Sequence, residues 1–352
     1  MKAYTYSGEK TRDLLLKHYR KYPLLRVEDI FKYLFQSAFG CEHLVSDLSA
    51  ALNYIKKERE STVSLPTLDE LDGEYTRVHI SCLAPETLAK LFCLSAKKEE
   101  GLAALKAKLE VAKELVAEGS LPLDGEEFAQ KLDAWRTAGY PALHHSEAFR
   151  AAYHPAYRVI ANKYAKFLSI FAEIDSLLAN GNAIIAIEGG AASGKTTLAG
   201  ILAEVYDCNV FHMDDFFLRP EQRTPERFAE IGGNVDRERF LEEVLEPLKR
   251  GDAVCYRPFD CGAWALGESI TVAPKKLTVI EGVYSMHPEL AQSYDYSVYL
   301  DIAPDLQRER IQERNSPAFA KRFFEEWIPL ENRYFEGMQV KERCCETIKI
   351  EK

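Results

Sequence analysis

A glycine-rich loop between a short apolar run and a helical segment constrains this sequence more than any other feature. The run Ala183–Glu188 is rich in isoleucine, as expected for a strand that is buried on both faces. It leads directly into Gly189-Gly190-Ala191-Ala192-Ser193-Gly194-Lys195-Thr196, which fits the pattern G-x-x-x-x-G-K-[ST]. A chance glycine-rich turn is the alternative, but the strand before the loop and the helix after it favour a phosphate-binding loop.

The loop residues have the chemistry that phosphate binding requires. Small residues allow the backbone to wrap closely, so that its N–H groups point at phosphate oxygens. The helix that starts at the loop adds a positive dipole end and free N–H donors. Lys195 is expected to reach the β- and γ-phosphates, and the Thr196 hydroxyl is expected to bind Mg²⁺. The residues predicted to bind the nucleotide are Gly189, Gly190, Ala191, Ala192, Ser193, Gly194, Lys195, Thr196 and Thr197.

The 352-residue chain is long enough for two domains, and the pattern of predicted secondary structure changes near residue 181. Upstream of this point helical periodicity dominates, with one short strand predicted at Arg77–Ser81. The clearest apolar stripe, with an alternating 4-3 spacing, predicts a core-facing helix over Ile160–Leu178 that ends at Asn180-Gly181. We therefore predict a mainly α-helical N-terminal domain over residues 1–180.

Strands and helices alternate in the second half. Alternation of this kind predicts a doubly wound parallel sheet with helices on both faces, which is an α/β fold. Residues 181–352 are thus predicted to form a P-loop NTPase domain. The further strands are expected at Asn209–Met213, Leu277–Glu281 and Tyr296–Asp301, and the helices at Thr196–Tyr206, Arg237–Arg250 and Asp305–Arg314.

Composition and charge exclude several classes of protein. The net charge of −10 argues against broad binding to nucleic acid or to anionic membranes, because both need a basic surface. No apolar run approaches membrane-spanning length, and the first twenty residues carry charges throughout, unlike a secretory signal. The eight cysteines form no C-x-x-C pair and no zinc spacing, which favours reduced thiols in the cytoplasm. The oligomeric state stays open, with a homodimer as one arrangement.

Acidic residues follow two of the predicted strands. Asp214 and Asp215 come at the end of the second strand, and Glu281 ends the third. The carboxyl ends of parallel strands face the ligand crevice, so these carboxylates are expected beside the phosphates. One aspartate could accept a proton from an attacking hydroxyl while the other helps to hold the metal, and Glu281 suits a Mg²⁺ contact. The alternative for the aspartates is a solvated turn.

Basic residues gather on the segment after the fourth strand. Arg308, Arg310 and Arg314 lie on the predicted helix, and Lys321-Arg322 follows it. Arginines on a mobile segment over the site could neutralise charge on the transferring phosphoryl group. We assign Arg310 and Arg314 to catalysis with Lys195, and Arg322 to the substrate. A charged, solvated helix face is the alternative.

The region from about Ile184 to Glu336 resembles the uridine kinase, nicotinamide riboside kinase and phosphoribulokinase group of P-loop kinases. The resemblance implies a five-stranded parallel sheet with a lid, and ATP with Mg²⁺ as cofactors. It also implies that Asp214 is the general base near Mg²⁺, whereas Asp215 could contact the substrate hydroxyls. The residues that carry it are Gly189–Thr197, Met213–Phe217, Val279–Gly282, the arginine-rich helix, and Glu326–Pro329 with Tyr334.

One segment departs from the uridine kinase pattern. Uridine kinases have a Tyr-Asp-Phe stretch followed by a His and an Arg that bind the nucleoside. The matching segment here, Tyr256–Trp264, is followed closely by neither residue, which argues against uridine or cytidine as the acceptor. Phe259, Asp260 and Trp264 are predicted to line an acceptor pocket, with Trp264 stacking on a ring or sugar face. They could equally be core residues.

The N-terminal half holds one polar constellation, which comprises His144, His145, His154, Tyr157 and Arg158. It could form an anion or substrate pocket that faces the kinase site, with Arg158 pairing a carboxylate or phosphate. No Cys and no paired acid complete a zinc ligand set. The other interpretation is a hydrogen-bonded packing cluster.

Together these features predict an ATP- and Mg²⁺-dependent kinase that transfers the γ-phosphate to a hydroxyl of a nucleoside, sugar or related metabolite. The alternative is a nucleotide-binding sensor, in which the N-terminal domain binds a ligand and the P-loop domain reports the ATP state. A GTPase switch is disfavoured, because the only Asn-Lys pair, Asn162-Lys163, precedes the loop and lacks the following Asp. The predicted partner is a small hydroxyl-bearing molecule.

Overall fold

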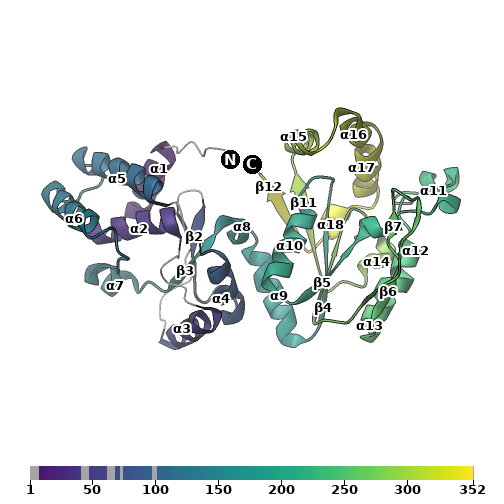
Figure 1. Cartoon of the computed structure of the whole chain (residues 1–352), viewed down its shortest axis with the longest axis horizontal. Coiled ribbons are helices and arrows are strands. Elements are labelled where there is room, and N and C mark those ends of the chain that lie inside the picture. Colours follow the sequence, from purple (N-terminus) through teal and green to yellow (C-terminus); the bar gives the residue numbers. More distant parts are fainter. Residues whose placement is uncertain (1–7, 41–46, 62–67, 72–73, 97–100, 352) are drawn as a thin grey trace. The chain divides into compact units, whose positions relative to one another are not determined.

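The computed structural model describes residues 8–40, 47–61, 68–71, 74–96 and 101–351. The chain divides into two compact units, Met1–Asp175 and Ser176–Lys352 (Figure 1). Among the described residues, no helix combines the length and the apolar character that a bilayer crossing demands. The described cysteines are all free thiols, and Cys41 lies outside the described residues.

The N-terminal unit is mainly helical, as predicted. Helices α2 and α5 pack against each other through apolar faces that include the buried residues Ile30, Leu34, Leu105 and Leu109. The helices of this unit are α1 (Gly8–Lys21), α2 (Val27–Phe39), α3 (Leu48–Ser61), α4 (Pro85–Leu94), α5 (Gly101–Ala117), α6 (Gly125–Thr137), α7 (Glu147–Tyr153) and α8 (Asn162–Ala165). Helix α9 (Leu168–Asn180) begins in this unit and ends in the next one.

A small antiparallel sheet accompanies these helices, in the order β1 (Leu68–Leu71), β2 (Tyr75–His79) and β3 (Tyr157–Ala161). Strand β2 begins two residues before the predicted strand at Arg77–Ser81. Strands β1 and β3 were not predicted. Thr76 of β2 pairs with Ile160 of β3, so the centre of the sheet is built from residues far apart in the sequence.

The predicted helix over Ile160–Leu178 is wrong at its N-terminal end. Residues up to Ala161 belong to β3, and the rest of the prediction corresponds to two helices, α8 and α9, with a turn at residues 166–167 between them. The apolar spacing continues across three elements, because Ile160, Tyr164, Phe167 and Phe171 are all buried. Spacing alone therefore could not locate the boundary, whereas the β-branched pair Val159-Ile160 favours a strand.

The C-terminal unit is built on a five-stranded parallel sheet, as predicted. Its order is β12 (Glu346–Ile350), β11 (Tyr296–Ile302), β4 (Ala183–Gly189), β10 (Leu277–Glu281) and β5 (Cys208–His212). All neighbouring strands are parallel. Figure 1 shows helix α10 (Lys195–Val205) on one side of the strands, and helices α12 (Arg237–Phe240), α13 (Glu246–Arg250) and α14 (Pro288–Ala291) on the other. The doubly wound α/β fold is thus confirmed.

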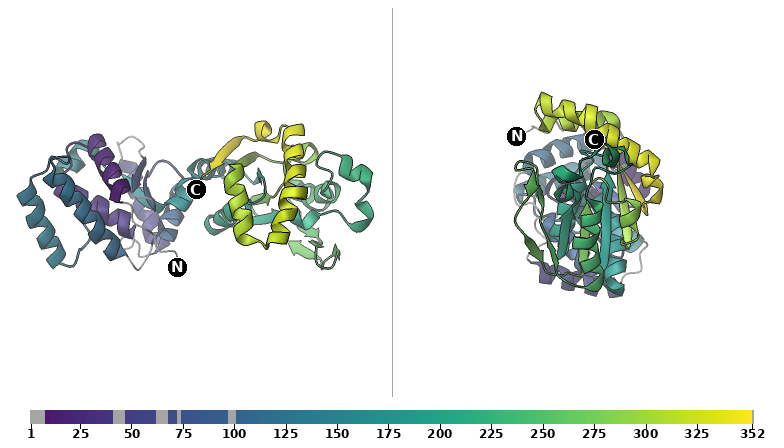
Figure 2. Two further views of the ribbon diagram at one scale, coloured as in Figure 1. Left: turned by 90° about the horizontal axis from the view of Figure 1, so that it is seen from above. Right: turned by 90° about the vertical axis from the view of Figure 1, so that its right-hand side faces the viewer.

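The remaining elements connect the strands. Helix α12 continues through a π-helical stretch into α13, so the helix predicted over Arg237–Arg250 is present. Helices α15 to α17 (residues 304–337), called the lid below, lie together in Figures 1 and 2. The connecting elements are η2 (Met213–Phe216), η3 (Pro220–Gln222), α11 (Pro225–Ala229), α12 (Arg237–Phe240), η4 (Leu241–Leu245), α13 (Glu246–Arg250), β6 (Val254–Tyr256), β7 (Phe259–Asp260), β8 (Ala265–Leu266), β9 (Ile270–Val272), α14 (Pro288–Ala291), α15 (Pro304–Arg314), α16 (Pro317–Arg322), η5 (Phe323–Trp327), α17 (Ile328–Gly337) and α18 (Val340–Arg343).

Candidate phosphate and acceptor site

The loop between β4 and α10 has a backbone that requires glycine at two positions. Gly189 has φ 143° and Gly194 has φ 101°, both in the region that side chains disfavour. A Cβ atom on Gly189 would also lie 2.6 Å from the carbonyl oxygen of Leu300 in β11. The pattern G-x-x-x-x-G thus has a steric cause in the fold, and it allows the loop to turn tightly at the carboxyl end of β4.

The groups around this loop fit a phosphate. Lys195 Nζ donates to the carbonyl oxygens of Gly189 (2.7 Å) and Gly190 (3.0 Å), so the ammonium is held inside the loop. Ser193 Oγ is buried without a hydrogen-bond partner. No side chain caps the start of α10, so its first N–H groups remain available to an anion. A lysine, an unpaired buried hydroxyl and a bare helix start form a cradle for phosphate oxygens.

A carboxylate of β10 joins the loop to β5. Glu281 Oε1 accepts a hydrogen bond from Thr196 Oγ1 (3.0 Å) and lies 2.7 Å from His212 Nδ1. This contact with Glu281 raises the pKa of His212. No three His, Cys, Asp or Glu side chains of the described segments are grouped to hold a metal by themselves. Mg²⁺ is commonly held by one or two carboxylates with substrate phosphates, so Thr196 and Glu281 fit a shared site of that kind.

The two aspartates of η2 have different surroundings. Asp214 is solvent-exposed. Its pKa is raised mainly by desolvation from the surrounding protein; the charge of Glu281 raises it further, whereas the charge of Lys195 lowers it. Asp215 instead accepts a hydrogen bond from the hydroxyl of Tyr256 (3.2 Å). Asp214 is therefore the aspartate that remains accessible to an acceptor hydroxyl.

Glu331 on α17 contacts the loop directly, which its sequence position did not suggest. Its Oε2 accepts a hydrogen bond from the Ala191 N–H (2.8 Å), and the side chain is buried. Burial raises the pKa of Glu331, with the charge of Asp214 adding and that of Lys195 opposing. A glutamate on an amphipathic helix carries no sequence signal for such a role.

A second buried acid, Glu188, lies behind the loop. Its carboxylate accepts hydrogen bonds from the backbone N–H groups of Gly189 (2.8 Å) and Met286 (3.1 Å), and from the Tyr334 hydroxyl (3.0 Å). Complete burial raises its pKa to about 7. One sequence signal could have revealed it, because an acid ending an otherwise apolar strand must be satisfied inside the protein.

Three arginines of the lid have a functional role predicted from the sequence, and one of them contacts the phosphate loop. Arg310 Nη1 donates to the Ala192 carbonyl oxygen (3.1 Å). Arg314 lies over the ring of Phe323, at 5.8 Å, and is exposed. Arg322 pairs with Glu326 on the lid itself (3.2 Å). The predicted catalytic role of Arg314 and the substrate role of Arg322 therefore stay predictions.

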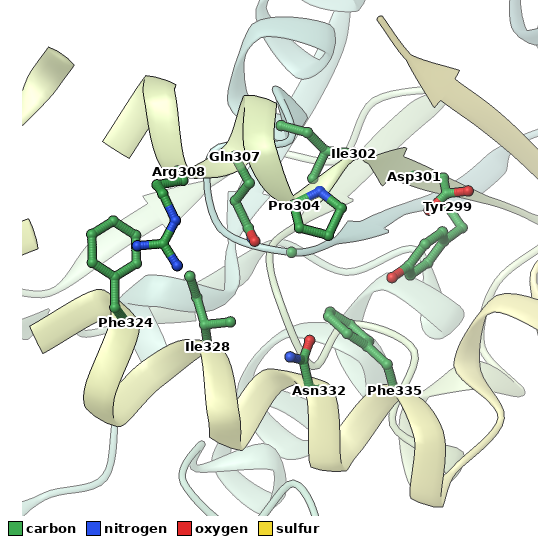
Figure 3. A pocket seen from close by; sticks show the side chains of 11 residues that line it. Tyr299, Asp301, Ile302, Pro304, Gln307, Arg308, Phe324, Ile328, Asn332 and Phe335 are labelled. Carbon is green, nitrogen blue, oxygen red and sulfur yellow. The ribbon is translucent and has the colours of Figure 1, made fainter. Parts of the chain in front are cut away.

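A cavity of about 350 Å³ borders the loop on the side of β11 (Figure 3). The figure shows Arg308 beside Phe324, and Asn332 and Phe335 projecting from α17. Arg308 stacks on the Phe324 ring at 4.6 Å, which fixes one wall of the cavity. The sequence did not predict this cavity. Its lining residues are Gly190, Tyr299, Asp301, Ile302, Pro304, Gln307, Arg308, Phe324, Ile328, Asn332 and Phe335.

The predicted acceptor residues differ in their settings. Phe259 is buried and belongs to the packing of β7. Asp260 Oδ1 accepts from the N–H groups of Gly262 (2.7 Å) and Ala263 (3.1 Å), so it shapes the turn between β7 and β8. Trp264 is 54% exposed, which is unlike a core residue. Trp264 and the exposed Asp260 are therefore accessible to an acceptor, whereas Phe259 is not.

The N-terminal constellation is joined by hydrogen bonds. His145 is buried, and its ring nitrogens lie 2.8 Å from Asp29 Oδ1 and 2.7 Å from the Tyr157 hydroxyl. Arg158 pairs with Glu58 (2.7 Å), while His144 and His154 are exposed. This arrangement favours the packing interpretation for His145.

No protein-family model matches the sequence, and the search of curated proteins returns no match. Among solved structures, one described as a possible uridine kinase from Bacillus stearothermophilus has 21% identity and a TM-score of 0.39, over 51% of this chain and 99% of that one. TT1252 from Thermus thermophilus has 16% identity and a TM-score of 0.28, over 49% and 90%. Shikimate kinase from Aquifex aeolicus has 17% identity and a TM-score of 0.26, over 48% and 87%. Each of these similarities covers about half of this chain.

Proposed function

We propose that this protein is an ATP- and Mg²⁺-dependent kinase that phosphorylates a hydroxyl of a nucleoside, sugar or related metabolite. One observation carries the proposal. The phosphate loop, the Thr196–Glu281 hydrogen bond and the exposed carboxylate of Asp214 meet at the carboxyl edge of a single parallel sheet. Electrostatic influence links Asp214 to both Lys195 and Glu281, so the candidate base lies beside the candidate phosphate and metal groups.

The residues divide the work of phosphoryl transfer between them. Lys195 and the first N–H groups of α10 bind the phosphate oxygens and reduce their charge. The oxygen of the acceptor hydroxyl bonds to the γ-phosphorus, and Asp214 accepts the proton of that hydroxyl. The bond between the γ-phosphorus and the oxygen that bridges it to the β-phosphate breaks, and ADP leaves. Thr196 and Glu281, together with phosphate oxygens, would hold Mg²⁺, which would supply further charge neutralisation.

The lid is positioned to exclude water from this reaction. Gln307 Nε2 donates to the Ala191 carbonyl oxygen (2.9 Å), so α15 rests on the loop together with Arg310. An apolar cluster of Ala191, Ile311 and Ala320 joins the loop to the lid. A closed lid lowers the chance that water takes the place of the acceptor. Arg314 and Arg322 contact lid residues here, so a direct role for either requires the lid to rearrange.

An ADP-release screen tests the proposal. The full chain is incubated with Mg·ATP and a panel of nucleosides, nicotinamide riboside, pantothenate, glycerate and sugars. We expect ADP formation above the water background with at least one acceptor, and its loss in Asp214→Asn. ATP binding without acceptor-dependent ADP across the panel would contradict the kinase proposal and support a nucleotide-binding sensor.

A further inference from the structure

Arg223 lacks an acidic partner in a segment where arginines are otherwise paired. No Asp or Glu of the described residues forms an ion pair with Arg223, which lies between η3 and α11. An unpaired arginine in a strongly acidic chain, with a net charge of −10, is a candidate anion ligand. The paired arginines nearby are Arg219 (with Asp236, 3.6 Å), Arg227 (with Glu238, 2.6 Å), Arg237 (with Glu289, 3.0 Å) and Arg239 (with Glu243, 3.3 Å).

The guanidinium of Arg223 is held in place by its neighbours. Its Nε donates to the Leu218 carbonyl oxygen (2.9 Å), and its carbon lies 4.5 Å from the ring centre of Trp264 and 5.7 Å from that of Phe259. These contacts use Nε and the faces of the guanidinium. Both Nη groups remain as donors, and the side chain is partly exposed. A fixed fork of two free donors matches the geometry of a carboxylate or phosphate.

The tryptophan that holds Arg223 has an unusual backbone. Trp264 has φ 54°, which is a costly conformation for a bulky residue, and its side chain is 54% exposed. Core packing therefore does not explain the conformation. Its ring stacks on the Arg223 guanidinium, so the turn between β7 and β8 presents the cation instead.

Arg223 lies on the acceptor side of the candidate site. Strand β7, which carries Phe259, packs against η2, which carries Asp214. Cys261, in the turn between β7 and β8, is influenced by both charges. Burial raises its pKa, with Asp214 adding to the increase and Arg223 opposing it. The proposed base Asp214 and the unpaired Arg223 thus both influence Cys261. Lys195, by contrast, donates its hydrogen bonds within the phosphate loop.

We infer that the phosphate acceptor carries an anionic group, a carboxylate or a phosphate, that pairs with Arg223. The inference rests on the proposed function, because it concerns the acceptor of the same site. Asp214 and Asp215 would repel an anionic acceptor, and Arg223 offsets that repulsion at the acceptor end. A neutral acceptor can accept hydrogen bonds from the guanidinium, but only an anion adds charge–charge attraction to them.

Matched pairs of hydroxyl compounds that differ in an anionic group test this inference. The pairs are glycerate with glycerol, pantothenate with pantothenol, and ribose 5-phosphate with ribose. Each compound is assayed for ADP release with Mg·ATP, and for binding by calorimetry in the presence of a non-hydrolysable ATP analogue. The first two pairs test a carboxylate and the third a phosphate. The full-length wild type is compared with Arg223→Gln.

We expect the anionic member of at least one pair to be preferred in kcat/KM and in binding. Arg223→Gln should reduce that preference by roughly 10- to 100-fold, as is typical for lost hydrogen bonds to a charged group. The matched control is Arg257→Gln. Arg257 is exposed and donates to the carbonyl oxygens of Leu266 (2.9 Å) and Gly267 (2.7 Å), so its removal should leave the preference unchanged.

The outcomes separate this inference from the proposed function. Acceptor-dependent ADP release that is confined to neutral compounds would overturn the inference and leave the kinase proposal intact. Arg223-dependent binding of an acid without ADP formation would show an anion site at Arg223, but it would overturn the kinase proposal and, with it, the inference that this anion belongs to a phosphate acceptor. The absence of any acid preference, or an acid preference that survives in Arg223→Gln, overturns the inference.

Discussion

Individual residues of the site occupy positions that have a cost in the folded protein. Ala192 in the loop has φ 59°, and Ser193 Oγ is buried without a hydrogen-bond partner. Glu188 and Glu331 are buried acids whose pKa values are raised. Strained and desolvated groups of this kind cluster at functional sites more often than elsewhere. The proposed reaction therefore takes place where the C-terminal unit has a strained backbone, an unpaired buried hydroxyl and buried acids.

The two aspartates of η2 give the first prediction. Asp214→Asn should lower kcat by roughly 10²- to 10⁴-fold, because an amide cannot accept the acceptor proton. Asp215→Asn should raise KM more than it lowers kcat, because Asp215 accepts a hydrogen bond from the Tyr256 hydroxyl and is not the proposed base. Steady-state kinetics with the best acceptor measures both. A large kcat loss in Asp215→Asn alone would show that the two roles are exchanged.

Glu188 predicts a pH dependence of stability. Its pKa in the folded state is about 7, above the ordinary value of 4.5, so the folded state holds the proton more tightly. The stabilisation is fully present below about pH 4.5 and is lost as the pH rises to about 7. The free energy of unfolding should fall by about 3 kcal/mol across this window. Urea unfolding of the wild type and of Glu188→Gln at a series of pH values isolates the contribution of Glu188. A difference in the free energy of unfolding between the two proteins that does not change with pH would contradict the prediction.

The elements of the C-terminal unit were predictable to a large extent because each has a local signal. The four predicted strands lie within one residue of β4, β5, β10 and β11, since buried parallel strands are short apolar runs. Strand β12 was missed because Glu346–Ile350 is an edge strand of mixed polarity. The acid–loop contacts and Arg223 were also missed, because they depend on tertiary packing between distant segments.

The contact between α17 and the loop gives a prediction at this scale. Glu331→Gln keeps a hydrogen-bond acceptor for the Ala191 N–H but removes a buried negative charge beside the phosphate cradle. We expect Mg·ATP to bind roughly tenfold more tightly, because the repulsion between like charges is removed. Calorimetry at pH 8 measures the change. Weaker binding would instead show that the carboxylate helps to hold the nucleotide complex.

At the scale of the whole molecule, the chain combines one unit with an interpretable site and one without. The sequence predicted a helical N-terminal region, but it left the histidine constellation open between a pocket and a packing cluster. The hydrogen bonds of His145 with Asp29 and Tyr157 join α2, the segment before α7 and β3, which are distant in sequence. Such a cluster can be read only after the chain is folded, because its partners share no local pattern.

The central claim is that the C-terminal unit transfers the γ-phosphate of ATP to a hydroxyl. The most direct measurement uses ATP labelled in the γ-phosphate and follows the label into the acceptor with full-length wild type and Lys195→Ala. We predict that the label appears in the acceptor with the wild type, and that the rate falls by about 10³-fold in a folded Lys195→Ala variant. Near-normal transfer in that variant, or label found only in inorganic phosphate with the wild type, would contradict the account.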